Sequence, residues 1–285
     1  YRGEKWNLYS SLNLNNRLRI IKGDRQVFTT YIDASEEPDS VDFDFDNHSE
    51  RIGYSFKFGA DYSINEHLIV NGEINYDQHL HEGINTQNNF LPYISKNIIN
   101  DRDYDDNYDV ECFFDISQTF DNPDKELNFS ISYDYQKDNE HESLEHDTTT
   151  LYQNIQGINI NLSYMYPLDE KSKIELGYDG KLNNNTETMD FEVTDTAGVY
   201  FKGNNAFGYK RSIHGFFLEY DYKFNEKFSI KPSMRYEYIR KNISFSSDPE
   251  QNVETTNLYG IILNNLDNSV YVDDYQTFYP NLHFT

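Results

Sequence analysis

The chain has 285 residues, of which 37% are hydrophobic and 16% aromatic, and its formal net charge is −25. This negative charge excludes nucleic acid as a partner, because phosphate backbones are bound by basic surfaces. The 25 Tyr and 20 Phe exclude an intrinsically disordered acidic chain, which would be poor in aromatic residues. No apolar run approaches the roughly 18 residues of a membrane-spanning helix, but a membrane β-strand needs only about 9–11 residues.

Apolar and polar residues alternate along the whole chain, and this alternation predicts about ten β-strands. The clearest example is the segment 51–77, where two alternating runs are separated by Asn65-Glu66. No amphipathic helix is expected. In chain order, the expected strands lie near residues 6–14, 51–64, 68–77, 108–120, 127–135, 158–168, 174–182, 216–224, 228–238 and 278–284.

The connections between these strands alternate in length. Short and long connections in turn are typical of an up-and-down outer-membrane barrel with short periplasmic turns and long extracellular loops. The sequence therefore predicts an all-β, antiparallel up-and-down transmembrane β-barrel, as one domain over residues 1–285 that is incomplete at both ends and belongs to a larger barrel. The tight connections are 65–66, 121–125, 169–173 and 225–226, and the long ones are 23–47, 79–105, 139–152, 189–207 and 246–272.

Charged residues fall in the phase opposite to the apolar row, as Lys57 does beside Phe56 and Glu219 beside Leu218. This predicts that the apolar row faces lipid and the charged row a wet lumen, so that the sheet has to close. The alternative is a soluble β-sandwich or lipocalin-like barrel with the apolar row inside, although strands of roughly 12–16 residues are long for a sandwich. Aromatic residues beside the tight turns predict an interfacial girdle: Tyr62, Phe120, Tyr166, Tyr222, Phe224 and Phe228.

The opening strand RGEKWNLY, the turns with Asn-Glu before His or Lys, and the closing strand FYPNLHF resemble the barrel part of Bacteroidetes-type TonB-dependent outer-membrane receptors. The resemblance covers nearly the whole chain and lies in the sequence pattern of the strands and turns rather than in one motif. It implies a 22-stranded barrel around an N-terminal plug in the outer membrane. It also implies uptake of a small extracellular substrate, namely a chelate, glycan or peptide nutrient. The implied partners are outer-membrane lipid and a TonB-type energiser that acts through parts of the protein outside this segment.

The segment DQHLHEG contains the sharpest group of candidate ligands. Asp77, His79 and His81 are two residues apart, so their side chains point to the same side of a strand, with Glu82 beside them. Two imidazoles and carboxylates can contact a metal or a metal chelate at the extracellular mouth. The alternative is a hydrated acidic rim, and no cofactor is expected beyond a loosely bound divalent cation. A second group, HESLEHD, contains His141, Glu145, His146 and Asp147.

Two acidic segments, EEPDSVDFDFDN and NDRDYDDNYDVE, fall in the expected long loops. Asp42, Asp44 and Asp46 match the first ligands of a calcium loop. The sixth position is Asn47 rather than Gly, and the twelfth is Gly53 rather than Glu, so an EF-hand is excluded. Loose divalent binding, such as calcium that bridges to lipopolysaccharide, and a simply solvated loop both stay open.

Catalytic motifs are missing from the sequence: it contains no GxSxG, HExxH, P-loop or dinucleotide-binding pattern. We therefore expect that the protein has no enzymatic activity. One alternative is a passive porin or surface-binding barrel. Another is a ten-strand omptin-like surface protease, which would use Asp77, His79 and His81 and would need its first strand to pair with its last. Cys112 lies in the apolar row and is interpreted as a small hydrophobic residue.

Overall fold

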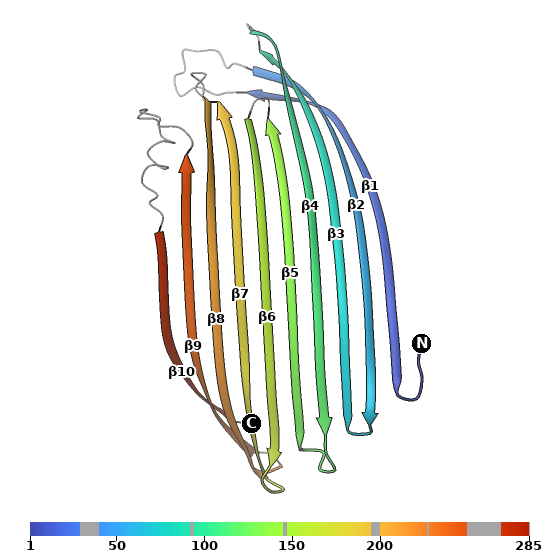
Figure 1. Cartoon of the computed structure of the whole chain (residues 1–285), viewed down its shortest axis with the longest axis vertical. Coiled ribbons are helices and arrows are strands. Elements are labelled where there is room, and N and C mark those ends of the chain that lie inside the picture. Colours follow the sequence, from blue (N-terminus) through green and yellow to red (C-terminus); the bar gives the residue numbers. More distant parts are fainter. Residues whose placement is uncertain are drawn as a thin grey trace.

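The computed structural model describes residues 1–28, 40–91, 94–144, 147–194, 200–226, 228–249 and 269–284. They form one antiparallel sheet in which each strand pairs with its neighbours in chain order, and β1 and β10 lie at its opposite edges (Figure 1). The predicted ten-stranded all-β meander is confirmed. Its strands are β1 Trp6–Phe28, β2 Ser40–Asn65, β3 Leu68–Leu91, β4 Ile94–Thr119, β5 Glu126–Leu144, β6 Asp147–Pro167, β7 Ser172–Thr194, β8 Tyr200–Asn225, β9 Phe228–Pro249 and β10 Ser269–Phe284.

The tight turns after β2, β4, β6 and β8 all lie at one end of the sheet, at the bottom of Figure 1. Short polar side chains close them. The Asn65 side chain accepts a hydrogen bond from the backbone N–H of His67 at 2.8 Å, and Asp169 accepts one from Lys171 at 2.8 Å. Asn and Asp favour turns because they can bond the backbone two residues further on. The predicted positions of the tight turns are confirmed.

The predicted long loops at 79–105, 139–152 and 189–207 are wrong, because most of their residues extend the strands. β3 runs on to Leu91 and β4 begins at Ile94. The acidic segment around Asp101 therefore belongs to β4, and Asp44 belongs to β2 rather than to a loop. These parts have few apolar residues, so alternation in the sequence is hard to detect. Their backbone ladder pairs regardless of which side chains it carries.

The register gives the sheet two chemically different faces. Phe56 pairs with Leu12 and Tyr76, and this face is called the outer face. Lys57 lies on the other face, called the inner face, where its ammonium forms an ion pair with Glu73 at 2.6 Å. Phe56 is 43% exposed, whereas the Glu73 side chain is only 21% exposed. The predicted separation of apolar and charged rows is confirmed.

A soluble sandwich would bury its apolar row between two layers, but the described residues form one layer. Within that layer, Ile213 and Ile239 are the buried hydrophobic residues, while Phe216, Leu218 and many others on the outer face are exposed. The sandwich alternative is therefore wrong. The part of the chain that the structure describes has no helix of the length and apolar character needed to cross a membrane.

Apolar residues dominate the outer face in a band that starts near the turns and ends part-way along each strand, with Ser10 and Gln118 as polar exceptions inside it. The strands are thus divided into a lower part that carries the band and an upper part beyond it. On β2 to β10 the band ends at Ile52, Tyr76, Tyr108, Tyr135, Ile158, Leu182, Phe216, Tyr238 and Phe278. The next outer-face residues are Glu50, Gln78, Asp106, Lys137, Gln156, Asn184, His214, Arg240 and Gln276.

The upper edge of the band crosses the strands obliquely. Following the register from Ile52 across seven strand spacings leads to Ser246 in β9, eight residues beyond Tyr238. With ~3.3 Å per residue and ~4.8 Å between strands, this offset corresponds to a strand tilt of about 40°. Membrane barrels have tilts of roughly 35–45°. The upper edge of the apolar band is therefore parallel to the membrane plane only if the strands are tilted as they are in a barrel.

Aromatic side chains concentrate at both edges of the band. Near the turns, the rings of Trp6 and Tyr62 stack with centroids 4.1 Å apart, and Phe224 lies 5.2 Å from Phe228. These contacts confirm the predicted aromatic cluster beside the turns. The sequence interpretation missed a second series near the upper edge. It consists of Tyr76, Tyr108 and Tyr135 on β3 to β5, and Tyr178, His214 and Tyr238 on β7 to β9.

Candidate functional site

The candidate site lies on the inner face of the upper part, between β3 and β4. His81 of β3 pairs with Asp105 of β4, and two residues further along Gly83 pairs with Asp103. Because alternate residues of a strand share a face, the His81, Asp103 and Asp105 side chains all project to the inner face. Antiparallel pairing therefore gathers three potential ligands from segments more than twenty residues apart in the sequence.

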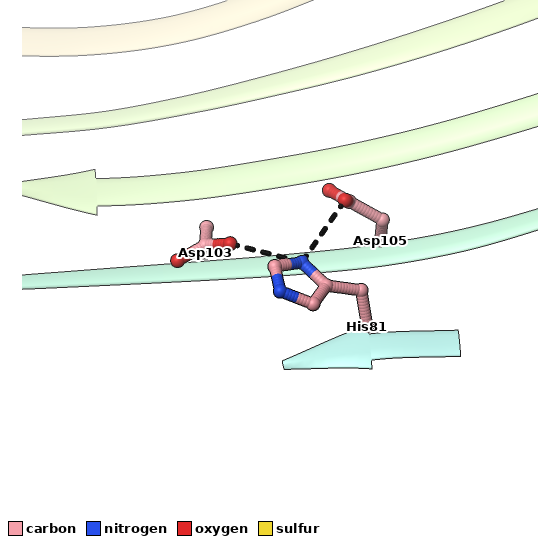
Figure 2. Close-up of side chains that lie close together, drawn as sticks. All are labelled: His81, Asp103 and Asp105. Carbon is pink, nitrogen blue, oxygen red and sulfur yellow. Dashed lines mark hydrogen bonds and ion pairs between the residues drawn. The ribbon is translucent and has the colours of Figure 1, made fainter. Parts of the chain in front are cut away.

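The three side chains point toward one another (Figure 2). His81 Nδ1 lies 3.1 Å from Asp103 Oδ2 and 3.3 Å from Asp105 Oδ2. The His81 side chain is 18% exposed, and those of Asp103 and Asp105 are 41% and 29% exposed. The other ring nitrogen, Nε2, lies 2.9 Å from the Ser49 hydroxyl of β2. The imidazole is thus held from both sides while its carboxylate partners stay accessible.

Gly83 makes the position of Asp103 possible. A Cβ atom built on Gly83 would overlap the Asp103 carboxylate, which lies over the glycine backbone. Any other residue at position 83 would push this carboxylate away from His81. The conformational freedom of glycine plays no part here, and what matters is the missing side chain.

The surroundings of the site are rich in carboxylates. Glu140 of β5 is the register partner of Asp105 on the other side of β4. Partial desolvation raises the pKa of the exposed Glu140 carboxyl, and the nearby charges of Asp105 and Asp138 raise it further. Burial likewise raises the pKa of Asp138, with an added contribution from Asp105. Each raised pKa means that the folded chain holds these negative charges at a cost, which a bound cation would lower.

The arrangement can hold a divalent metal ion. Within the described residues, His81, Asp103 and Asp105 are the group whose potential ligand atoms all lie within 4.8 Å of one another. Metal–ligand bonds of roughly 2.0–2.2 Å place neighbouring ligand atoms about 3 Å apart, as the nitrogen and oxygen atoms are here. Nε2–H can donate to Ser49, which is the orienting hydrogen bond that metal-bound histidines usually make. A direct hydrogen bond from Nδ1–H to a carboxylate is the other arrangement that this geometry suits.

The other ligands predicted from DQHLHEG are placed differently. Asp77 and His79 share the inner face with His81, but their partners on β4 are Asp109 and Asn107. Glu82 lies on the outer face, opposite Tyr104, so its carboxylate cannot join the His81 group. The metal role of Asp77 and His79 stays a prediction. Sequence reasoning did not place Asp103 and Asp105 beside His81, since spacing within one strand says nothing about register with the next.

In the second predicted cluster, the described residues make structural contacts. His141 Nδ1 lies 2.8 Å from the Thr150 hydroxyl on the neighbouring strand, and the Asp147 carboxylate accepts a hydrogen bond from the Thr194 backbone N–H at 2.7 Å. Glu145 and His146 lie outside the described residues.

Ion pairs cover the inner face of the lower part. Lys231 pairs with Glu219 at 2.5 Å, and Arg235 contacts both Glu237, at 2.7 Å, and Asp179. Charges are therefore held at the same height as the apolar outer-face band, but on the opposite side of the sheet. This is the pattern of a wall between lipid and water.

A family model described as the outer membrane protein beta-barrel family matches residues 118–285, more than half of the chain. The chain belongs to the outer membrane protein beta-barrel family. Membership in this family places the chain in the outer membrane, as the sequence predicted. None of the curated proteins matches the chain.

Solved structures of the same architecture include the siderophore receptor PiuA from Acinetobacter baumannii, with 7% identity and a TM-score of 0.50 over 99% of this chain and 47% of that chain. The ferric yersiniabactin uptake receptor FyuA from Yersinia pestis is 7% identical, with a TM-score of 0.41 over 98% of this chain and 57% of that chain. The outer membrane protease OmpT from Escherichia coli is 10% identical, with a TM-score of 0.32 over 99% of this chain and 96% of that chain. The likeness to PiuA is one of fold, and this family member spans about half the length of the two receptors.

Proposed function

We propose that the chain forms part of the wall of a larger receptor barrel, which takes up a small nutrient with energy from a TonB-type partner. The observation that carries this proposal is that the described strands form a ten-strand sheet in which β1 and β10 do not pair, with an apolar outer face and an ion-paired inner face. Barrels of about 22 strands enclose a lumen wide enough for a plug, whereas small barrels fill theirs with side chains.

The edges of the sheet support a larger barrel. In the described residues, β1 pairs only with β2, and β10 only with β9. Backbone N–H and C=O groups at an edge have no water to bond in a bilayer, so further strands have to pair with them. A ten-strand protease would need β1 to pair with β10. We therefore favour the receptor and expect no catalytic turnover.

The candidate site suggests the kind of substrate. His81, Asp103 and Asp105 lie in the upper part of the inner face, beyond the apolar band, which we assign to the extracellular mouth. The carboxylates around them favour a substrate that carries positive charge or a metal ion. Of the possible substrates, a metal chelate or a cationic peptide suits this mouth better than a neutral glycan.

Uptake by cells that make the full-length protein tests the proposal. Cells with and without a working TonB-type energiser would be compared for accumulation of labelled peptides and metal chelates. We expect accumulation only with the energiser, and we expect His81→Ala to weaken it more than His79→Ala. Accumulation that is independent of the energiser would instead support the passive porin, which needs no energy to admit its solutes.

A further inference from the structure

The outer face carries a pocket of about 380 Å³ at the upper edge of the apolar band, formed by β5 to β9. Its apolar side is a lateral row in which Tyr133 pairs with Ile158, and Ile158 with Leu182. The band ends on β6 and β7 at the last two of these residues. The pocket therefore spans the border between apolar and polar outer surface.

The polar side of the pocket is basic. Lys210 of β8 and Arg240 of β9 line it from diagonal positions, since Lys210 pairs with Asn242 and Arg240 with Ser212. Acidic residues outnumber basic ones by 49 to 24 in the chain, yet none of the described residues that line this pocket is acidic. Two cations in a pocket that no carboxylate lines are unusual in such a chain and favour an anionic ligand.

Neither cation is used by the fold. Among the described residues, the Lys210 ammonium and the Arg240 guanidinium make no hydrogen bond or ion pair. Asp274 is the register partner of Arg240 on β10, but its carboxylate accepts a hydrogen bond from the Tyr238 hydroxyl at 3.5 Å and does not line the pocket. The Asn184 Oδ1 atom, also in the lining residues, is buried without a hydrogen-bond partner. Besides Arg211, whose position alternates to the inner face, the pocket thus offers two cations that have no partner among the described residues. It also contains a buried amide oxygen that lacks a hydrogen-bond partner.

We propose that this pocket binds a phosphorylated glycolipid of the outer leaflet, of the lipopolysaccharide class. The phosphate lies between Lys210 and Arg240, the sugar hydroxyls contact amides such as Asn184, and an acyl chain runs down along Ile158 and Leu182. A lipid anchored in the membrane explains why cations and apolar side chains share one pocket on the outer face. A soluble anion would need only the cations. The proposal concerns the opposite face from the uptake site, so either can fail without the other.

Native mass spectrometry of the full-length protein in mild detergent tests this proposal, with lipid A and dephosphorylated lipid A as probes. We expect wild-type protein to retain lipid A, and each of Lys210→Gln and Arg240→Gln to weaken retention roughly tenfold. Lys210→Arg should keep it. Arg102→Gln removes a cation from the same face outside the pocket and serves as the matched control. Heat-dependent gel mobility would verify that each variant has folded.

Three results would overturn the proposal. The double variant with Lys210→Gln and Arg240→Gln could retain as much lipid A as wild type. The Arg102→Gln control could lose as much as the pocket variants, which would indicate an effect of net charge alone. Dephosphorylated lipid A could bind as well as lipid A, which would leave only apolar contact with the band.

Discussion

The lower and upper parts of the strands share one hydrogen-bonded register, but they differ in the side chains on their outer face. On β7 the outer face shows Leu176 near the turn and Thr188 near the other end, and both are held by the same pairing to β6 and β8. In the lower part the inner face is charged and the outer face apolar, whereas in the upper part both faces are mainly polar, with isolated apolar residues such as Ile84 and Val272. The backbone hydrogen bonds thus determine the shape of the sheet. The outer-face side chains alone determine which length of each strand can lie in the hydrocarbon layer of a bilayer.

An arginine placed at two heights of β7 would test this difference most strongly. Leu176→Arg should reduce the free energy of folding into lipid bilayers by about 2–4 kcal/mol, because the cation would lie within the hydrocarbon. Thr188→Arg on the same face should change it by less than about 0.5 kcal/mol. Urea titrations of the full-length protein in lipid vesicles would measure both. Equal losses at the two heights would show that the band does not mark the bilayer.

The two faces can be compared at one height with neighbouring residues of β2. Phe56→Arg should reduce the free energy of membrane assembly by about 2–4 kcal/mol, because its cation would face lipid. Ser55→Arg should be tolerated, since its cation joins a charged inner face. Heat-modifiable mobility of the protein in outer-membrane fractions would report assembly. If both variants assembled equally well, the assignment of the outer face to lipid would be wrong.

In the upper part, we expect substitution of His81 and of His79 to have different effects on metal binding. We expect His81→Ala to weaken binding of Zn²⁺ or Mn²⁺ roughly 10- to 100-fold, since it removes the nitrogen ligand between two carboxylates. His79→Ala should have little effect, because Asn107 rather than a carboxylate faces it on β4. Isothermal titration of the full-length protein would measure both. If wild-type protein bound no ion, the contacts of His81 with Asp103 and Asp105 would be structural only.

The smallest expected effect concerns the partly buried carboxylate of Asp138 in the same region. Burial raises the pKa of Asp138, so its ionised form destabilises the fold, and this penalty is present at neutral pH and absent below the unfolded pKa of about 3.9. Asp138→Asn should therefore stabilise the protein at pH 7 by about 0.5 kcal/mol, after allowance for solvent screening. Thermal unfolding at pH 7 and near pH 3.5 would measure the gain, which should vanish at the lower pH. Glu82→Gln removes the same charge from the outer face and should give no comparable gain.

Much of the lower part could be predicted from the sequence. Regular alternation around Phe56 and Leu218 revealed ten strands and their faces, and Asn65-Glu66 and Asp169 marked turns. The upper part could not be predicted in the same way. Around Asp101 both faces are polar, so the two rows look alike in the sequence, and the sequence alone predicts a loop there. One member of the predicted ligand group, Glu82, occupies the opposite face from His81, while Asp103 and Asp105 joined His81 through a register that the sequence does not reveal.

The sequence by itself determined that the chain is a membrane β-meander, because a period of two in hydrophobicity is a local property that each strand carries alone. It also determined which residues share a face within a strand. Only the tertiary structure decided which residues of different strands become neighbours. Register brought Asp103 and Asp105 to His81, and it brought Lys210 and Arg240 to the end of an apolar row from β5 to β7. Cross-strand pairing depends on the whole hydrogen-bonded ladder, and no single segment of the sequence contains that information.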